Sequence, residues 1–394
     1  MNRLRFLTAG ESHGPALTAS LEGLPAGLAL SAADINADLA RRQVSFGAGG
    51  RMKIERDAAQ ILGGVMRGET TGAPLALLIP NLDHAHWQGR AVPPMTTPRP
   101  GHADLTGAVK YGYRDLRLGL ERASARETGA RVAVGAACRK LLAEFNIRVG
   151  SYVVEIGGAA ASLDEIELPE RLARAEASDV RCPDETAAAL MRARISAAIE
   201  ARDTVGGLFE VVALGVPPGL GGHVHWDRRL GAQLAAALMS IPAIKGVEVG
   251  TAFANARRFG TEVHDEILLA PEGGRLARQT NRGGGLEGGI TTGQPIVLRA
   301  AMKPISTTLN PLRSVDLATG APAATQYERS DYCAVPRAGV VGEAMMCFVL
   351  AGALLEKLGG DSVAEMKPRF ETLRQARLED LPMDNAPAVF WPEG

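Results

Sequence analysis

Aromatic side chains are scarce in this sequence, and neither sign of charge is in clear excess. Phe, Trp and Tyr make up 4% of the 394 residues, and 43 basic side chains stand against 44 acidic ones, which gives a formal net charge of −1. A nucleic-acid-binding protein more often has a clear basic excess, so we expect no nucleic-acid partner. The hydrophobic share of 46% is enough for a sizeable core.

Cysteine is rare, and long apolar runs are missing. The four cysteines, Cys138, Cys182, Cys333 and Cys347, lie far apart and form no C-x-x-C pair. We therefore expect reduced, mostly buried thiols rather than a disulfide framework or a zinc site. No apolar run approaches the length needed to cross a bilayer, and the N-terminal segment is too poor in apolar residues for a secretion signal. We expect a cytoplasmic protein with no membrane partner.

Several signatures of common enzymes are also missing. The sequence has no G-x-S-x-G, no H-E-x-x-H, no P-loop and no catalytic cysteine signature, so the usual hydrolase and ATP-site interpretations lack support. Residues 283–289 (GGGLEGG) contain a formal G-x-G-x-x-G, but residues 291–295 (TTGQP) stop the helix that a dinucleotide fingerprint requires. These glycines form either a loop whose amides approach a ligand closely or a flexible surface loop.

The sequence does contain an internal repeat. Residues 23–28 (GLPAGL) recur as 215–220 (GVPPGL), and residues 70–75 (TTGAPL) recur as 291–296 (TTGQPI). Such turns match by chance, but two matches in the same order favour duplication. We predict a single domain over residues 1–394, with pseudo-repeats over about 1–160 and 205–360 that pack together around a pseudo-twofold axis. A helical insert over about 161–204 and an irregular tail over about 381–394 complete the prediction.

Residue patterns within the repeats predict the elements. The expected helices cover residues 32–42, 123–145, 228–239 and 338–358, and the sequence 183–186 (PDET) is a further helix start signal. The expected strands cover residues 4–8, 60–66, 149–156, 208–214 and 262–269. Short turns between strands suit antiparallel pairing, and regular strand–helix alternation is weak. The predicted class is therefore α+β, with helices layered on antiparallel sheets.

Histidine and arginine supply the candidate site residues. His13 and His102 each lie beside a glycine in a loop, and histidine is the natural proton carrier near neutral pH, although each alone is more often structural. His84 and His86, like His223 and His225, are expected to be solvent-exposed rather than metal ligands, and no metal site is predicted.

Arginines gather in one segment, at positions 114, 117, 122, 126 and 131. Arg122 and Arg126 are expected on one face of a helix start, where guanidinium groups and free amides bind phosphate or carboxylate. The alternative is ordinary i,i+4 pairing with Glu121, Glu127 and Asp115.

Read together, these segments resemble the chorismate synthase family. The matching segments are 8–14 (TAGESHG), 99–104 (RPGHAD), 121–128 (ERASARET), 243–248 (AIKGVE), 284–289 (GGLEGG), 302–307 (MKPIST) and 329–336 (RSDYCAVP). They occur in family order from about residue 4 to about residue 360.

The resemblance implies a β-α-β sandwich with two antiparallel sheets, and a homotetramer. It implies conversion of 5-enolpyruvylshikimate 3-phosphate to chorismate and phosphate by 1,4-elimination, the last common step of aromatic amino-acid biosynthesis. It also implies reduced FMN as cofactor, an external flavin reductant and a link to NADP. The alternatives are a non-flavin phosphatase or isomerase acting on a phosphorylated cyclic acid, or a non-catalytic anion-binding protein.

The resemblance also assigns roles to residues. His13 would be the general acid for phosphate departure, His102 would protonate the reduced flavin, and Asp331 would help the flavin ring nitrogen remove the ring hydrogen. FMN would be held by Arg122, Ala123, Ser124, Pro242, Ala243, Gly288, Lys303, Pro304, Ile305, Ser306, Thr307 and Arg329. Substrate would be held by Ser12, Arg42, Arg117, Arg126 and Arg337. The family usually has an arginine where this sequence has Ala48, so one cation is missing unless Arg51 compensates.

Overall fold

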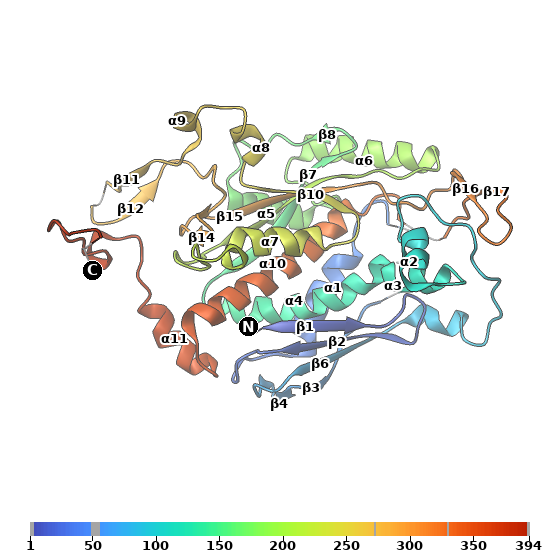
Figure 1. The fold of residues 1–394 in the computed structure, drawn as a ribbon, viewed down its shortest axis with the longest axis horizontal. Coiled ribbons are helices and arrows are strands. Elements are labelled where there is room, and N and C mark those ends of the chain that lie inside the picture. The colour runs from blue at the N-terminus through green and yellow to red at the C-terminus, as the bar shows by residue number, and fades with distance from the viewer. Residues whose placement is uncertain (1–3, 49–55, 272, 329–330, 392–394) are drawn as a thin grey trace.

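Two antiparallel sheets enclose a layer of helices in the computed structural model, which describes residues 4–48, 56–271, 273–328 and 331–391 (Figure 1). One sheet has four strands and the other has five, and every pairing between their neighbouring strands is antiparallel. The predicted α+β class and β-α-β sandwich are confirmed.

The first sheet has the strand order β1-β2-β6-β3. Its strands are β1 (Arg5–Ala9), β2 (Ala16–Glu22), β6 (Leu75–Pro80) and β3 (Gln60–Gly63). Alternate residues of β2 are buried, with Leu17, Ala19 and Leu21 turned to the core. The opposite face is open, because the side chains of Leu7 and Leu62 are 74% and 61% exposed.

The second sheet has the strand order β10-β15-β9-β7-β8. Its strands are β10 (Ile244–Val249), β15 (Ile296–Met302), β9 (Gly207–Leu214), β7 (Arg148–Ile156) and the short β8 (Ala159–Ala160). The order β7-β9-β15-β10 corresponds strand for strand to β1-β2-β6-β3 of the first sheet. The predicted repeat is therefore a repeat of sheet topology, although the residue bounds given for it stay a prediction.

Two threonines show the repeat at the level of atoms. The Thr70 hydroxyl donates to Pro25 O over 2.6 Å and accepts from Leu28 N over 3.0 Å. The Thr291 hydroxyl likewise donates to Pro217 O over 2.7 Å and accepts from Leu220 N over 2.9 Å.

Both threonines lie in short hairpins. The hairpins pair β4 (Val65–Met66) with β5 (Glu69–Thr70), and β13 (Leu286–Glu287) with β14 (Ile290–Thr291). The glycine-rich run thus forms a hairpin followed by a strand, and the rejection of a dinucleotide fingerprint is confirmed.

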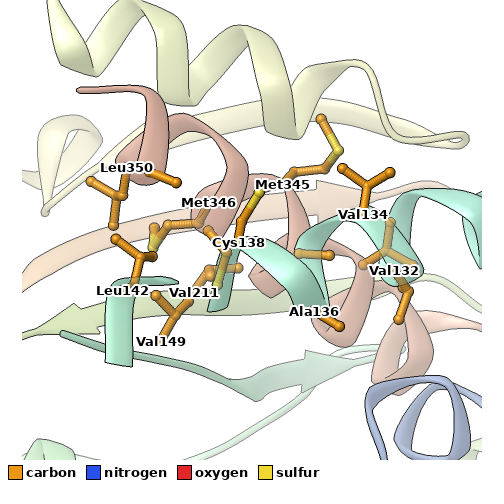
Figure 2. Packing of buried hydrophobic residues seen from close by; sticks show 14 of the residues in the cluster. Val132, Val134, Ala136, Cys138, Leu142, Val149, Val211, Met345, Met346 and Leu350 are labelled. Atoms are coloured by element: carbon orange, nitrogen blue, oxygen red, sulfur yellow. The ribbon is translucent and has the colours of Figure 1, made fainter. Parts of the chain in front are cut away.

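The helical layer consists of α1 (Ala32–Gln43), α4 (Thr128–Ala143), α7 (Leu230–Met239) and α10 (Val335–Leu358). Helix α4 packs against β2 and β6, α10 packs against β7 and β9, and the two helices pack against each other. Figure 2 shows this interface, where Cys138 and Leu142 of α4 face Met346 and Leu350 of α10. The helices cross closely at Gly135, because a Cβ atom there would lie 2.3 Å from that of Ala344.

A charged cluster joins the helices inside the core. Glu343 of α10 is fully buried and accepts hydrogen bonds from Arg41 (2.8 and 3.0 Å), Arg139 (2.7 Å), Arg181 (3.0 Å) and Ser151 (2.6 Å). Burial alone would raise the pKa of Glu343, but the three arginines hold it below its usual range. The carboxylate therefore ties α10 to both α1 and α4.

Helix α10 corrects one prediction about apolar runs. Its 24 residues are long and apolar enough to cross a membrane by composition. The statement that no run approaches this length is therefore wrong. Nevertheless, 89% of its most apolar stretch is buried, because α10 packs against β7 and β9 of the second sheet and against α1, α4 and α7. It is the central core helix of the fold.

The segment between β7 and β9 contains α5 (Leu168–Ala177) and α6 (Glu185–Glu200), with Asp184 as the N-cap of α6. Helix α5 covers the outer face of the second sheet, where Tyr152 and Val212 are buried. The remaining elements are η2 (Leu82–His86), α2 (Asp104–Tyr111), α3 (Arg117–Ala123), η3 (Ala125–Glu127), η4 (Trp226–Arg228), α8 (Ala252–Asn255), α9 (Gly260–Val263), β11 (Ile267–Leu269), β12 (Leu276–Arg278), β16 (Arg313–Val315), β17 (Pro322–Ala324), α11 (Val363–Glu371) and η5 (Leu378–Asp380). Residues 381–391 form no helix or strand.

Three predicted elements differ from the observed ones. The strand expected over 60–66 is broken at Gly64, which has a φ of 88°, into β3 of the first sheet and β4 of a hairpin. The helix expected over 123–145 is interrupted at Ser124, whose hydroxyl accepts from Arg126 N and starts a 3₁₀ turn before α4. The strand expected over 262–269 begins only at Ile267, because the Glu262 carboxylate accepts from Phe259 N and supports the short helix α9. The four cysteines are buried and unpaired, as predicted.

Candidate active site

A cavity of about 380 Å³ lies at one end of the sandwich. Its polar and charged lining residues are Ser12, His13, Arg42, Arg99, His102, Ser124, Arg126, Thr128, Lys303, Ser306, Thr307, Glu328, Asp331 and Arg337. In both sheets, the chain segments that line the cavity adjoin the same strand ends. Ala16 at the start of β2 pairs with Pro80 at the end of β6, and Gly207 at the start of β9 pairs with Met302 at the end of β15. The volume lies in the range of small-molecule sites.

The two central helices begin at this cavity. Thr128, the first residue of α4, and Ala334, the N-cap of α10, both line it. The first turn of a helix has backbone N–H groups without intrahelical partners and the positive end of the helix dipole. The cavity is therefore suited to an anionic ligand before any side chain is counted.

Three charged side chains form a buried group at the start of α4. Asp57 bonds Arg126 Nη1 over 2.5 Å and Arg42 Nη1 over 3.2 Å, and Arg42 Nε donates to Thr128 Oγ1 over 3.0 Å. Burial, followed by the positive charge of Arg337, lowers the pKa of Arg42 to about 9. A bound anion would offset both effects, so this group fits a phosphate or carboxylate.

Arg337 adds a further cation from α10. Its Nε donates to the carbonyl of Arg42 over 2.9 Å, and its Nη1 is paired with the Asp331 carboxylate. Arg42 thus contacts the beginnings of both central helices, through Thr128 at α4 and through Arg337 at α10.

His13 lies in the turn between β1 and β2, held by residues distant in sequence. Its Nδ1 is 2.7 Å from Glu121 Oε1, and its ring contacts Trp87 with centroids 4.3 Å apart and the ring planes tilted by 41°. The neighbouring Ser12 hydroxyl donates to the Ser124 hydroxyl over 3.1 Å. These contacts place a proton carrier beside the arginine group.

His102 has a carboxylate partner too. Its Nδ1 lies 2.6 Å from Oδ1 of Asp104, which is fully buried and also accepts from Arg99 Nε over 2.8 Å. Burial would raise the pKa of Asp104, but the His102 and Arg99 hydrogen bonds hold it well below its usual range. The carboxylate is ionised and fixes both basic side chains.

The segment after β15 forms a partly apolar wall. Ile305 and Met302 line the cavity beside Lys303, whose Nζ donates to Ser306 Oγ over 2.9 Å. Burial, together with Lys245, lowers the pKa of Lys303. Ala243, also in the wall, has a φ of 70°, a conformation that costs free energy for a residue with a Cβ and is common at functional sites.

Comparison with known proteins identifies the family. Residues 4–355 match the chorismate synthase family. The chain is 54% identical to chorismate synthase of Aquifex aeolicus over 387 residues, with 93% of this chain and 96% of that protein covered. It is also 54% identical to chorismate synthase of Rubrobacter xylanophilus, with 94% and 96% covered. A crystal structure of a chorismate synthase superimposes with a TM-score of 0.76 at 47% identity and covers 93% of this chain.

The chain belongs to the chorismate synthase family. The predicted resemblance is thereby confirmed, and with it the prediction of a carbon–oxygen lyase. Most of the residues that the family resemblance assigned meet in the cavity. Those that line it are Ser12, His13, Arg42, His102, Ala123, Ser124, Arg126, Pro242, Ala243, Lys303, Ile305, Ser306, Thr307, Asp331 and Arg337.

Four assigned residues are not part of the cavity lining. Arg122 turns away and donates to the carbonyls of Thr8 (2.8 Å) and Gly10 (3.3 Å), so the expectation that it shares a helix face with Arg126 is wrong. The others are Arg117, Gly288 and Pro304.

Each of these three has a different position. Gly288 turns in the β13–β14 hairpin, near the start of β15, whereas the cavity is at the end of that strand. Pro304 is exposed between two lining residues. Arg117 lies over the Trp87 ring at 5.7 Å, and its buried Nε and Nη1 have no hydrogen-bond partner among the described residues. Arg329 and Arg51 fall outside the described residues.

The remaining histidines follow the prediction with one exception. His86, His223 and His225 are exposed. His84 is half-buried, because its Nδ1 lies 2.9 Å from the carbonyl of His13, and its predicted exposure is wrong. Within the part of the chain that the structure describes, no group of three or more metal-ligating side chains is found.

Asp57, Asp104, Glu121 and Trp87 belong to the site but were not assigned to it by sequence. Glu121 was considered only as an i,i+4 partner of an arginine. The one available signal is that the segments 99–104 and 121–128 each contain an acidic residue beside a functional one. That signal does not reveal which histidine each carboxylate contacts.

Proposed function

We propose that this cavity is where the chain converts 5-enolpyruvylshikimate 3-phosphate to chorismate and phosphate by 1,4-elimination, with reduced FMN as cofactor. The chain is a lyase of the shikimate pathway by its family membership. The observation that carries the site assignment is the meeting of two carboxylate-bound histidines and the buried arginines in one cavity, at the beginnings of α4 and α10.

The residues present fit a flavin. Ala123, Pro242, Met302 and Ile305 offer apolar surface for a flat ring, and Lys303 offers a positive charge nearby. Arg117 Nε and Nη1 are buried and make no hydrogen bond among the described residues, and Nη1 lies 3.8 Å from Glu328, which lines the cavity. When bound, reduced FMN would supply an electron-rich ring for an elimination that has no net redox change. Of the residues proposed to hold it, those that line the cavity are Ala123, Ser124, Pro242, Ala243, Lys303, Ile305, Ser306 and Thr307. The proposal for Arg122, Gly288, Pro304 and Arg329 rests on the family motifs alone.

The arginine group fits the substrate, which has one phosphate and two carboxylates. Arg42, Arg126 and Arg337 are proposed to bind these anions, together with Ser12 and Arg117. The guanidinium forks of the first three are fixed by hydrogen bonds to Thr128, Asn81 and the Arg42 carbonyl, so little side-chain entropy would be lost on binding.

Departure of phosphate requires a proton, and His13 is proposed to supply it. Its Nδ1 is hydrogen-bonded to Glu121, so Nε2 is the ring nitrogen that can contact a ligand in the cavity. His102 is proposed to hold the proton that would be given to the reduced flavin, and Asp331 to assist removal of the ring hydrogen. Both line the cavity.

A homotetramer, an external flavin reductant, a link to NADP and a cytoplasmic location complete the proposal. Exposed apolar side chains support assembly. Phe253 and Phe259 are 64% and 82% exposed, and Ile267 and Leu269 in the nearby β11 are 57% and 55% exposed. Patches of this kind commonly mark subunit interfaces. Light scattering of the purified chain tests the tetramer.

The test of the function is an anaerobic assay with chemically reduced FMN and 5-enolpyruvylshikimate 3-phosphate. Chorismate absorbance and phosphate release are followed together. We expect both in equal amounts, and neither without reduced FMN. Phosphate without chorismate would instead indicate the phosphatase alternative, which no observation on the structure favours.

A further inference from the structure

His13 is held by both oxygens of one carboxylate. Glu121 Oε1 lies 2.7 Å from His13 Nδ1, and Glu121 Oε2 accepts from the His13 backbone N–H over 2.7 Å. Both side chains are largely buried, with 15% and 14% exposed. The Trp87 ring lies against the imidazole, tilted by 41° with centroids 4.3 Å apart. Two bonds from one carboxylate to the ring and backbone of the same residue fix the side-chain torsions of His13.

The same contacts locate a proton. Burial alone would raise the pKa of Glu121, but the ring and backbone hydrogen bonds of His13 hold it below its usual range. An ionised carboxylate only accepts hydrogen bonds, so Nδ1 must be protonated at 2.7 Å. Within the described residues no hydrogen bond reaches Nε2, which is therefore the nitrogen presented to a ligand in the cavity.

The second histidine of the cavity has a different charge balance. Asp104 also fixes Nδ1–H of His102, yet it accepts three hydrogen bonds from Arg99, from its backbone N, Nε and Nη2. A doubly protonated His102 would give this group a net positive charge. Among the described residues, the hydrogen bonds to the Glu121 carboxylate come from His13, through its ring and its backbone N–H, and Arg117 acts on this carboxylate only through its charge. Glu121 thus places its negative charge beside the His13 ring, whereas the charge of Asp104 is shared between His102 and Arg99.

We propose that Glu121 is a positioning residue that holds His13 with Nδ1 protonated and Nε2 facing the substrate as proton donor. The inference rests on the proposed function, because it gives a structural cause for the acid role of His13. It adds a residue that touches neither substrate nor cofactor, and whose effect is exerted through the imidazole alone.

The test compares Glu121→Gln with Glu127→Gln, a matched change six residues further along the same segment. Glu127 pairs with Thr8 and Arg131 and does not line the cavity. A glutamine at 121 cannot accept from both donors of His13, since its amide nitrogen donates. We expect kcat for chorismate to fall by about 10- to 1,000-fold in Glu121→Gln, with KM within about threefold. Glu127→Gln should keep the wild-type kcat.

A spectroscopic measurement separates positioning from general damage. Nitrogen NMR of ¹⁵N-histidine-labelled protein, with His13→Asn for assignment, reports which ring nitrogen of His13 is protonated. We expect Nδ1–H in the wild type and a mixture of tautomers in Glu121→Gln. Unchanged tautomer signals, or unchanged turnover, in Glu121→Gln would overturn the inference. If the wild-type protein makes no chorismate, but the tautomer signals of His13 still differ between the wild type and Glu121→Gln, the proposed function would be refuted and not the positioning role of Glu121.

Discussion

The two halves of the molecule, β1 to α4 and β7 to α10, share a strand order but use one connection differently. In the first half, residues 10–15 join β1 to β2 and present Ser12 and His13 to the cavity. In the second half, the corresponding connection runs over residues 157–206 and contains α5 and α6, of which α5 covers the outer face of its sheet.

The segments after β6 and after β15 occupy corresponding positions in the two halves but carry different side chains. The segment after β6 brings Arg99 and His102 to the cavity, and the segment after β15 brings Lys303 and its neighbours. The comparison teaches that the strands and the threonine turns maintain the scaffold, whereas the connections at one end supply the function.

The largest effect should follow removal of a group that only the first half provides. We expect His13→Ala to lower kcat for chorismate by about 10²- to 10⁴-fold, because general acid catalysis typically contributes that much. The anaerobic assay measures it. His225→Ala, an exposed change in the second half, serves as control and should have no effect. A normal kcat in His13→Ala would remove the functional difference between the halves.

The next effect concerns the joint between the halves. Glu343→Ala leaves the buried Arg181 and the part-buried Arg41 and Arg139 without their shared, fully buried carboxylate, so we expect the free energy of unfolding to fall by about 3–5 kcal/mol. Urea denaturation measures the loss. Glu356→Ala on the same helix removes only an exposed pair with Arg228, 3.5 Å apart, and should cost about 1 kcal/mol or less. Equal losses would show that the buried cluster does not hold the halves together.

A smaller, symmetrical effect is expected at the two threonine turns. Thr70→Val and Thr291→Val each leave a buried backbone amide without its acceptor, so each should lower the free energy of unfolding by about 1–3 kcal/mol. Thr71→Val, at an exposed hydroxyl, is the control. Losses that differ by more than about 1 kcal/mol would show that the corresponding turns are not energetically equivalent.

The smallest effect is expected from placing an arginine at position 48, in the connection between α1 and β3 of the first half. Ala48→Arg should lower KM for the substrate by about two- to fivefold, the gain expected from one partly exposed ion pair. Ala48→Gln adds a polar side chain without the charge and serves as the control. Identical KM values for the two variants would show that no anion is bound near this position.

The sequence predicted elements where local pattern decides and missed contacts that tertiary packing creates. The residue patterns predicted β1, β3, β7 and β9, but no strand was predicted at β2 or β10. The break at Ser124 was missed because alanine-rich flanks predict one continuous helix. The apolar length of α10 was missed because small residues separate its larger ones.

The candidate site was predicted through family motifs rather than through its contacts. Glu121 is 108 residues from His13, and Asp57 is 69 residues from Arg126. No local pattern links such pairs, since the fold alone brings them together. Arg122 shows the reverse case. Its spacing to Arg126 indicated one shared helix face, but the helix is interrupted at Ser124 and the two side chains point to different partners.

The position of α10 in the chain has a consequence for synthesis. This helix covers the inner face of the second sheet at β7 and β9 and one side of α4, and it is formed by residues 335–358. While the ribosome makes the preceding residues, these surfaces have no partner. This part of the core must therefore wait until residue 358 has been made, and until then the nascent protein exposes the apolar surface that α10 will cover.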